Sequence, residues 1–169
     1  MNKAVFLDRD GVINKERSDY VKTVSELEIL SNISRSIKLL KDAGFLVIVI
    51  TNQSAINRGL TTHENVKNVH NTIQEFLKKN GTAVDGFYYC PHISEENCFC
   101  RKPKPGLLQK AAQEFDIELK SSWMIGNNDS DVESAINAGC KAIKINTKKT
   151  LENAIFEILA ANSEKILKN

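Results

Sequence analysis

The sequence predicts an α/β fold in which a mostly parallel, doubly wound sheet carries helices on both faces. Two observations support this prediction. Short apolar runs, typical of buried strands, alternate along the chain with segments whose apolar residues recur at helical spacing. Within each run the residues are all apolar instead of alternately apolar and polar, as expected when helices cover both faces of a parallel sheet. Such sheets bind their ligands at the carboxyl ends of the strands.

The expected strands are rich in β-branched and aromatic residues, which favour a pleated and buried surface. The first, "AVFL", is followed directly by acids, and the second, "FLVIVI", by hydroxyl and amide residues. The later runs "FYY", "WMI" and "AIKI" are shorter but have the same character. The five expected strands cover residues 4–7, 45–50, 87–89, 123–125 and 142–145.

The expected helices are bounded by capping residues. Thr61 and Glu64 match a capping box, and Pro105 suits the first turn of a helix. Gly44 and Gly139 follow apolar helical faces, where a glycine commonly ends a helix. The expected helices cover residues 33–43, 61–79, 105–115, 131–138 and 151–168.

Length and composition limit the possible functions. The chain has 169 residues, which fits one domain over residues 1–169, and its net charge is only +2. That charge is too small to indicate a nucleic acid or an anionic membrane as partner. No stretch approaches the ~20 apolar residues of a membrane span, and the N-terminus does not resemble a signal peptide. We therefore expect a cytoplasmic protein, and a monomer because no long apolar stripe is evident.

Polar side chains follow three of the expected strands where each strand ends. Asp8 and Asp10 follow the first strand, residues 51–54 ("TNQS") the second, and residues 126–131 ("GNNDSD") the fourth. Parallel strands bring these segments to one edge of the sheet, and the basic pair Arg101-Lys102 could join them there. Carboxylates, a lysine and hydroxyls suit phosphoryl transfer assisted by Mg²⁺.

Taken singly, these clusters have simpler interpretations. Two acids after a strand commonly form a turn, as does the pair Thr51-Asn52. A basic pair such as Arg101-Lys102 is more often solvated than bound to phosphate. The prediction of a catalytic site therefore depends on their occurring together and in a particular order.

That order resembles the four motifs of haloacid dehalogenase superfamily phosphatases. The segments "DRDGVIN", "VITNQSAINRG", "YYCPH", "CFCRKPKPG" and "NAG" further resemble the branch that contains D,D-heptose 1,7-bisphosphate phosphatases and the histidinol-phosphatase domain. The resemblance covers residues 3–145, and five ordered motifs are far more specific than a lone D-x-D. It implies a phosphatase with this α/β fold, a zinc loop and no large cap domain.

The resemblance also implies a role for each matching residue. Asp8 would be the nucleophile and a Mg²⁺ ligand, and Asp10 the general acid and base, with its carbonyl on the metal. Thr51 would bind a phosphoryl oxygen, and Lys102 would steady both Asp8 and the transferring phosphate. Arg101 matches the arginine that recognises the second phosphate of the substrate.

Further substrate contacts are expected from the loops around the strand ends. With no sizeable cap, the pocket should be walled by residues 15–22, residues 54–60 and the cysteine-rich loop. Within that loop, the segment 16–20 is expected to contribute sugar contacts and is one residue longer than usual in the branch. The expected substrate-binding residues are Arg17, Asp19, Tyr20, Asn52, Gln53, Ser54, Arg101 and Asn128.

Three of the four cysteines lie close together beside a histidine, in the pattern C-x-H-x₅-C-x-C. Such spacing can surround one ion with a closed Cys₃His set, which is typical of structural Zn²⁺ and matches the zinc loop of the same branch. Reduced buried cysteines are the simpler alternative. Cys140 is expected in the core, and His63 and His70 are not expected to be ligands. The predicted zinc ligands are Cys90, His92, Cys98 and Cys100.

One position departs from the branch pattern. The fourth motif commonly reads G-D-x-x-x-D, but here Asn127 stands where the first acid, a Mg²⁺ ligand, is expected. An amide oxygen can still bind Mg²⁺, yet one negative charge is lost. A different metal site that uses Asp129 or Asp131 is one way to replace that charge. The following residue, often lysine in the bacterial enzymes, is Asn128.

The resemblance implies a phosphohydrolase that removes the C7 phosphate of D-glycero-D-manno-heptose 1,7-bisphosphate through an aspartyl phosphate, in a pathway that feeds surface glycans. Its small-molecule partner would be a sugar phosphate, and its metals catalytic Mg²⁺ and structural Zn²⁺. Two alternatives stay open. One is a histidinol-phosphate phosphatase, and the other is a sugar-phosphate-binding protein without turnover, because of Asn127.

Overall fold

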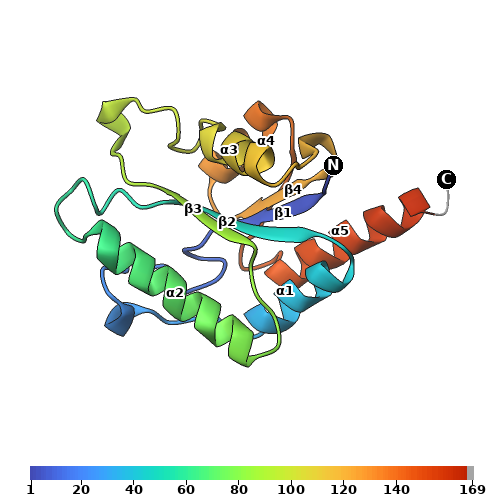
Figure 1. The fold of residues 1–169 in the computed structure, drawn as a ribbon, viewed down its shortest axis with the longest axis horizontal. Coiled ribbons are helices and arrows are strands. Elements are labelled where there is room, and N and C mark those ends of the chain that lie inside the picture. Colours follow the sequence, from blue (N-terminus) through green and yellow to red (C-terminus); the bar gives the residue numbers. More distant parts are fainter. Residues whose placement is uncertain (167–169) are drawn as a thin grey trace.

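The computed structural model describes residues 1–166, which form one parallel sheet covered by helices on both faces (Figure 1). Its five strands lie in the order β3-β2-β1-β4-β5, and every neighbouring pair is parallel. The predicted fold class is therefore confirmed. The strands are β1 (Ala4–Leu7), β2 (Leu46–Asn52), β3 (Gly86–Cys90), β4 (Trp123–Gly126) and β5 (Lys141–Lys144).

Helices α1, α2 and α5 lie on one face of the sheet, and α3 and α4 lie on the other (Figure 1). Short 3₁₀ turns occupy Val24–Glu26, Ser94–Glu96 and Leu119–Ser121. The helices are α1 (Ile33–Asp42), α2 (His63–Lys79), α3 (Gly106–Glu114), α4 (Asp129–Ala138) and α5 (Leu151–Ile166).

Alternate side chains of β1 enter two separate hydrophobic cores. Val5 and Leu7 pack with α1, α2 and α5, whereas Ala4 and Phe6 pack with α3 and α4. All four side chains are buried, because β1 is the central strand of the sheet. This double burial explains the uninterrupted apolar runs in the sequence, and it fixes β1 as the rigid base on which the following acids stand.

Several expected boundaries are wrong by one or two residues. Thr62, not Thr61, caps α2 by accepting a hydrogen bond from Asn65 N at 3.1 Å, while the Thr61 hydroxyl donates to a loop carbonyl. Pro105 is the N-cap of α3 rather than its first residue. Helix α4 begins two residues early, at Asp129, because Asn128 and Asp131 form a capping box.

The remaining differences are small. The strand expected at 142–145 covers Lys141–Lys144, and the strands expected at 45–50 and 87–89 extend to Asn52 and Cys90. The final helix was expected to reach residue 168, but residues 167–168 lie outside the described part of the chain. Within the described residues, none of the helices combines the length and the apolar character that crossing a membrane requires.

Candidate active site and metal centre

Asp8 stands at the carboxyl end of β1 and is held by a buried lysine. Lys102 Nζ lies 2.9 Å from Asp8 Oδ1 and 2.6 Å from Asp131 Oδ1, and it also donates to the carbonyl of Ile50 at 2.9 Å. All three charged side chains are buried. The sheet thus joins the end of β1, the start of α4 and the loop before α3 at one point.

One lysine does not fully compensate two buried carboxylates. Burial raises the pKa of Asp8 to about 6, although Lys102 opposes the shift, and the nearby Asp131 raises it further. The pKa of Lys102 is raised, because the charges of Asp8 and Asp131 outweigh the effect of its own burial. More positive charge near Asp8 would therefore favour its ionised, nucleophilic form.

The carboxylate of Asp10 is fixed by donors on three sides. Arg9 Nη2 lies 3.0 Å from both of its oxygens, Asn14 Nδ2 donates at 2.9 Å, and Gln53 Nε2 donates at 2.8 Å. Burial opposes ionisation of Asp10, but the Arg9 charge and these hydrogen bonds prevail and lower its pKa. The same Gln53 nitrogen also lies 2.9 Å from Thr51 Oγ1, which links Asp10 to the end of β2.

Asn52, the last residue of β2, fixes the backbone that carries Lys102. Its Nδ2 donates to the Lys102 carbonyl at 3.1 Å, and its Oδ1 accepts from the Lys102 N–H at 3.1 Å. The Asn52 side chain thus satisfies the backbone N–H and carbonyl of Lys102, which lies in a loop and has no strand partner. This contact explains how a residue outside the sheet reaches Asp8 in a defined orientation.

Asn127 lies against the backbone at Gly11, directly after the acids that follow β1. A side chain at Gly11, whose φ is +81°, would place its Cβ 2.3 Å from Asn127 Nδ2, so only glycine fits there. Asn127 Nδ2 donates to Glu16 Oε2 at 3.0 Å, and Asn127 Oδ1 accepts from Asn128 Nδ2 at 3.1 Å. The carboxylate beside Asn127 is therefore that of Glu16.

The two acids considered as substitutes for an acid at position 127 are engaged elsewhere. Asp129 is exposed and pairs with Lys144 Nζ at 2.7 Å. Asp131 is buried, with one oxygen on Lys102 and the other accepting the N–H of Asn128 at 3.0 Å.

A pocket of about 530 Å³ opens at the strand ends, beside Asp8, Asp10 and Asp131. Asn127 and Asp129 are not among the residues that line it. The charged side chains around it are the acids Asp8, Asp10, Glu16 and Asp131 and the bases Arg17 and Lys102, so four negative charges face two positive ones. Such a pocket suits a divalent cation, whereas a phosphate dianion would be repelled without one. The residues present therefore fit Mg²⁺.

Only some of the expected substrate-binding residues line this pocket. Asp19 and Ser54 are not among the residues lining the pocket, and neither is the rest of the loop at 54–60. Asp19 instead pairs with Arg17 Nε at 3.0 Å and with Lys22, and Ser54 is buried. Of the expected contacts, the pocket is lined by Arg17, Tyr20, Asn52, Gln53 and Asn128.

Arg101 faces a second pocket, of about 350 Å³, that shares Asn52, Lys102 and Ser130 with the first. Its guanidinium donates to the carbonyl of His92 at 3.1 Å, and its backbone N–H donates to Cys98 Sγ at 3.3 Å. Both contacts go to the cysteine-rich loop. That loop therefore determines where Arg101 lies relative to Lys102.

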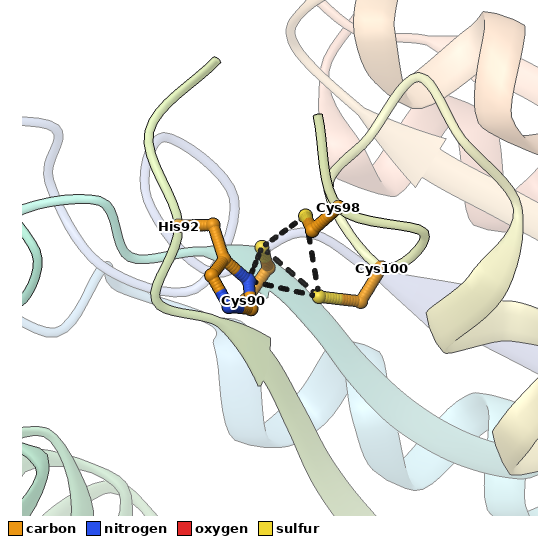
Figure 2. Close-up of side chains that lie close together, drawn as sticks. All are labelled: Cys90, His92, Cys98 and Cys100. Carbon is orange, nitrogen blue, oxygen red and sulfur yellow. Dashed lines mark hydrogen bonds between the residues drawn. The ribbon is translucent and has the colours of Figure 1, made fainter. Parts of the chain in front are cut away.

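The four predicted zinc ligands converge (Figure 2). Cys90 ends β3 and His92 follows it, and both meet the two cysteines that return from the loop before α3. Their ligand atoms all lie within 4.8 Å of one another, with contacts of 3.2–3.6 Å between Sγ and Nδ1 atoms. Zn–S bonds of about 2.3 Å span a tetrahedron with edges of about 3.8 Å, so Zn²⁺ needs only slight expansion.

The thiols also differ in acidity. Burial raises the pKa of Cys90, and its thiol contacts with Cys100 and Cys98 add to that shift. For Cys98 burial acts in the same direction, but the N–H of Arg101 and the neighbouring thiols outweigh it and lower the pKa to about 7. A thiol of low pKa is the natural first ligand for a metal, which then deprotonates the others. Cys140, as expected, is a buried core residue.

Two buried residues at the site were not identified from the sequence. Arg9 has no exposed surface, although it reads as an ordinary charged residue between two acids. His70 is buried within α2 and lies 3.3 Å from Arg9, while His63 is exposed. The available signal was spacing, because His70 falls on the same helical face as Val66 and Ile73, which are buried.

The fold and the strand-end carboxylates define a hydrolase of the haloacid dehalogenase type, and the HAD-hydrolase-like family model matches residues 99–167. The D-glycero-beta-D-manno-heptose-1,7-bisphosphate 7-phosphatase of Helicobacter pylori is 41% identical over 98% of this chain and 95% of its own length. An enzyme of Photorhabdus laumondii, named for the alpha anomer, is 34% identical over 91% of this chain and 90% of its own.

Among solved structures, the D,D-heptose 1,7-bisphosphate phosphatase of B. bronchiseptica, complexed with magnesium and phosphate, superposes with a TM-score of 0.81. It is 28% identical, and 99% of each chain is covered. This chain therefore belongs to the heptose-1,7-bisphosphate 7-phosphatase family of phosphatases, and the predicted resemblance is confirmed.

Proposed function

We propose that this chain is a Mg²⁺-dependent phosphatase that removes the C7 phosphate of D-glycero-D-manno-heptose 1,7-bisphosphate. The observation that carries the proposal is the buried Asp8–Lys102 contact beside Asp10, at the mouth of a pocket adjoined by a second, basic one. A single phosphate needs only the first pocket. The names of the relatives supply the sugar.

Mg²⁺ would be held by the carboxylate of Asp8, the backbone carbonyl of Asp10 and the amide oxygen of Asn127. When bound, it supplies positive charge that lets an anionic nucleophile approach an anionic phosphate. The excess of acids in the first pocket and the raised pKa of Asp8 support a cation beside Asp8, whereas the role of Asn127 rests on its position in the fourth motif.

In the first half-reaction, a carboxylate oxygen of Asp8 attacks phosphorus and forms an acyl phosphate, while the bond from phosphorus to the C7 oxygen breaks. The leaving oxygen keeps the bonding pair and takes a proton from Asp10. Lys102 lies 2.9 Å from Asp8 and neutralises charge that builds on the phosphoryl group. The hydroxyl of Thr51 is available to bind another phosphoryl oxygen.

In the second half-reaction, Asp10 accepts a proton from a water molecule that attacks the phosphorus of the acyl phosphate. The bond between phosphorus and the Asp8 oxygen breaks, which releases inorganic phosphate and restores the carboxylate. The charge of Arg9 and the hydrogen bonds from Arg9, Asn14 and Gln53 favour ionised Asp10, which is the form left by the first half-reaction and the form that this step requires.

Arg101 would bind the second phosphate of the substrate in the second pocket. Its guanidinium can offer charge-assisted hydrogen bonds there, and the loop of the cysteine cluster anchors it on both backbone and side chain. This basic pocket favours a bisphosphate over histidinol phosphate, which carries one phosphate. Arg17, Tyr20, Asn52, Gln53 and Asn128 would contact the sugar, with Asp19 holding Arg17 and Ser54 supporting the base of the site.

Zn²⁺ would be structural, because Cys90, His92, Cys98 and Cys100 fill all four positions of a tetrahedral ion. We further infer a single domain over residues 1–169, a monomer, and a cytoplasmic location. The net charge of +2 supports a small-molecule substrate rather than a nucleic acid or a membrane surface.

Phosphate release tests the proposal. The chain and its Asn127→Asp variant would be incubated with Mg²⁺ and either anomer of the heptose bisphosphate, or with histidinol phosphate. Phosphorus NMR would show which ester is lost. We expect loss of the C7 ester, retention of the C1 ester and little action on histidinol phosphate.

Other outcomes are equally informative. Turnover by Asn127→Asp alone would mean that the asparagine has disabled the metal site of a phosphatase scaffold. Saturable binding of the bisphosphate without turnover by either protein would establish the non-catalytic alternative. Preferential release from histidinol phosphate would overturn the substrate.

A further inference from the structure

Arg9 is a charged side chain with no exposed surface, and it lies between the two acids that follow β1. A buried guanidinium is costly unless partners compensate its charge and its hydrogen bonds. The structure gives it one anionic partner, the carboxylate of Asp10, at 3.0 Å from Nη2 to each oxygen. Arg9 Nε has no hydrogen-bond partner within the described residues. Its energetic compensation therefore depends on Asp10.

The other end of the guanidinium rests on His70. Arg9 Nη1 lies 3.3 Å from His70 Nε2, and since arginine can only donate, that nitrogen must be the acceptor. His70 is therefore the neutral tautomer with its proton on Nδ1. Its ring is stacked on Phe87 of β3, with centroids 4.7 Å apart and planes 16° apart, and lies edge-on to Tyr89. Helix α2 and strand β3 thus fix the acceptor, and the acceptor fixes Arg9.

The electrostatics agree with this geometry. Burial of His70, followed by the charge of Arg9, lowers its pKa to about 3, so the ring stays neutral at physiological pH. A neutral ring adds no second positive charge behind Asp10. His70 therefore holds the positive charge of Arg9 in a fixed position against the carboxylate of Asp10.

We propose that Arg9, held by neutral His70, is a positioning residue that fixes the carboxylate of Asp10 for proton transfer. The inference rests on the proposed function, in which Asp10 is the general acid and base. Asp8 accepts from the backbone N–H of Arg9 at 2.8 Å, whereas the guanidinium contacts the carboxylate of Asp10, so the Arg9 side chain acts through Asp10. Asn14 and Gln53 complete the orientation, and Gln53 extends it to Thr51.

A double-mutant cycle tests whether Arg9 acts through Asp10. Arg9→Met, Asp10→Asn and the double variant would be compared by kcat/KM on the heptose bisphosphate, with Lys41→Met as the control. Lys41 pairs with Asp85 at 2.6 Å, away from the pocket, so its loss removes an ion pair but should not change activity. We expect Arg9→Met to lose about 10²-fold in the native background. In the Asp10→Asn background it should lose less than about threefold.

A second substrate separates positioning from general damage. The leaving group of 4-nitrophenyl phosphate departs without a proton, so a defect in Asp10 should matter little in its kcat/KM. We expect Arg9→Met to lose less than about fivefold on it. Equal losses on both substrates, or additive losses in the cycle, would show a merely structural role and overturn the inference.

The two levels of the proposal can fail separately. If Asp10→Asn itself shows no loss specific to the sugar substrate, the proposed role of Asp10 is wrong and the inference falls with it. If Asp10→Asn shows that loss but Arg9→Met does not, the proposed function stands and only the inference is overturned.

His70 provides a matched pair of variants should Arg9→Met fail to fold. His70→Gln keeps an acceptor for Arg9, whereas His70→Leu removes it at a similar size. We expect kcat/KM on the heptose bisphosphate to fall about tenfold for His70→Leu, and by at most about threefold for His70→Gln. The loss for His70→Leu should be smaller on 4-nitrophenyl phosphate. Equal activity of the two variants would contradict the proposed support.

Discussion

The strand-end site and the cysteine loop are neighbours that are built by different means. At the strand ends, the protein supplies opposite charges for its own buried groups: Lys102 lies between Asp8 and Asp131, and Arg9 lies on Asp10. In the cysteine loop, the ligand atoms mainly contact one another.

The surroundings differ in the same way. Strand β1 is buried on both faces, whereas Phe99, between two of the cysteines, is 66% exposed. Cys90 lies in the core and the partly buried Cys98 and Cys100 pack against it, but residues 94–97 between them are exposed, so a metal would hold that segment. The comparison predicts that folding preforms the carboxylates at the strand ends, while the loop that carries Arg101 would depend on zinc.

Replacing Asp8 by asparagine should cause the largest loss in the strand-end site without disturbing its structure. The amide can still accept from Lys102 and from the N–H of Arg9, but it cannot attack phosphorus. We expect phosphate release to fall by about 10⁴-fold or more, with an unchanged melting temperature. Substantial turnover by a correctly folded variant would show that another residue is the nucleophile.

Removing zinc should damage the cysteine loop and leave the sheet intact. The protein should contain about one zinc per chain, and Cys98→Ser or a chelator should remove it. Hydrogen exchange should then speed up in residues 90–104 but not in β1, β2 or β4. Because Arg101 and Lys102 follow the loop, kcat/KM on the bisphosphate should fall by about 10²-fold. A zinc-free protein that is folded and still protected from hydrogen exchange in residues 90–104 would show that the cysteine loop does not need zinc.

Arg101→Met should show whether the second pocket contributes to substrate binding and not to the reaction in the first pocket. We expect KM for the bisphosphate to rise about tenfold, because one charge-assisted contact is lost, while kcat changes little. A monophosphate of the same sugar, lacking the C1 phosphate, serves as the internal control and should be unaffected. A similar loss on both substrates would place Arg101 in the reaction itself.

Asn127→Asp should sharpen the account of the strand-end metal site. An added carboxylate should tighten Mg²⁺ binding about tenfold, as measured by titration calorimetry. Without metal the same change replaces a donor to Glu16 by a second negative charge, so the metal-free melting temperature should fall. Glu16→Gln in the Asn127→Asp background should restore it. Unchanged Mg²⁺ affinity would indicate that residue 127 does not bind the ion.

The last expected effect concerns the pH dependence of stability. The pKa of His70 is about 3 in the folded protein, below its value near 6.5 when unfolded, so the unfolded state binds the extra proton between these values. Stability is therefore present above pH 6.5 and falls as the pH drops toward 3, by at most about 1.4 kcal/mol per pH unit from this group. Denaturant titrations should show a shallower dependence for His70→Gln.

Much of the fold and both clusters could be predicted from the sequence. Continuous apolar runs identified the strands, because β1 is buried on both faces, and close spacing identified the four side chains that converge as a possible zinc site. The clustering of polar residues at one edge of the sheet could be predicted because parallel strands bring their carboxyl ends together. These features depend on local pattern, so one sequence reveals them.

Long-range contacts could not be predicted in the same way. Nothing near Arg9 in the sequence points to His70, which lies 61 residues away, or indicates that an arginine there is fully buried. Likewise, Glu16 meets Asn127 across 111 residues. Helix α4 begins early because the side chain of Asp131 caps it, a choice that the spacing of apolar residues does not record.

The most direct test of the account is to trap the covalent state of the strand-end site. The protein would be mixed with the heptose bisphosphate and Mg²⁺, quenched in acid within milliseconds, digested and examined by mass spectrometry. We predict one phosphoryl group on the peptide that contains Asp8, formed as fast as turnover and absent from Asp8→Asn. Phosphate release with no such adduct at any quench time, or with the adduct on another peptide, would contradict the account.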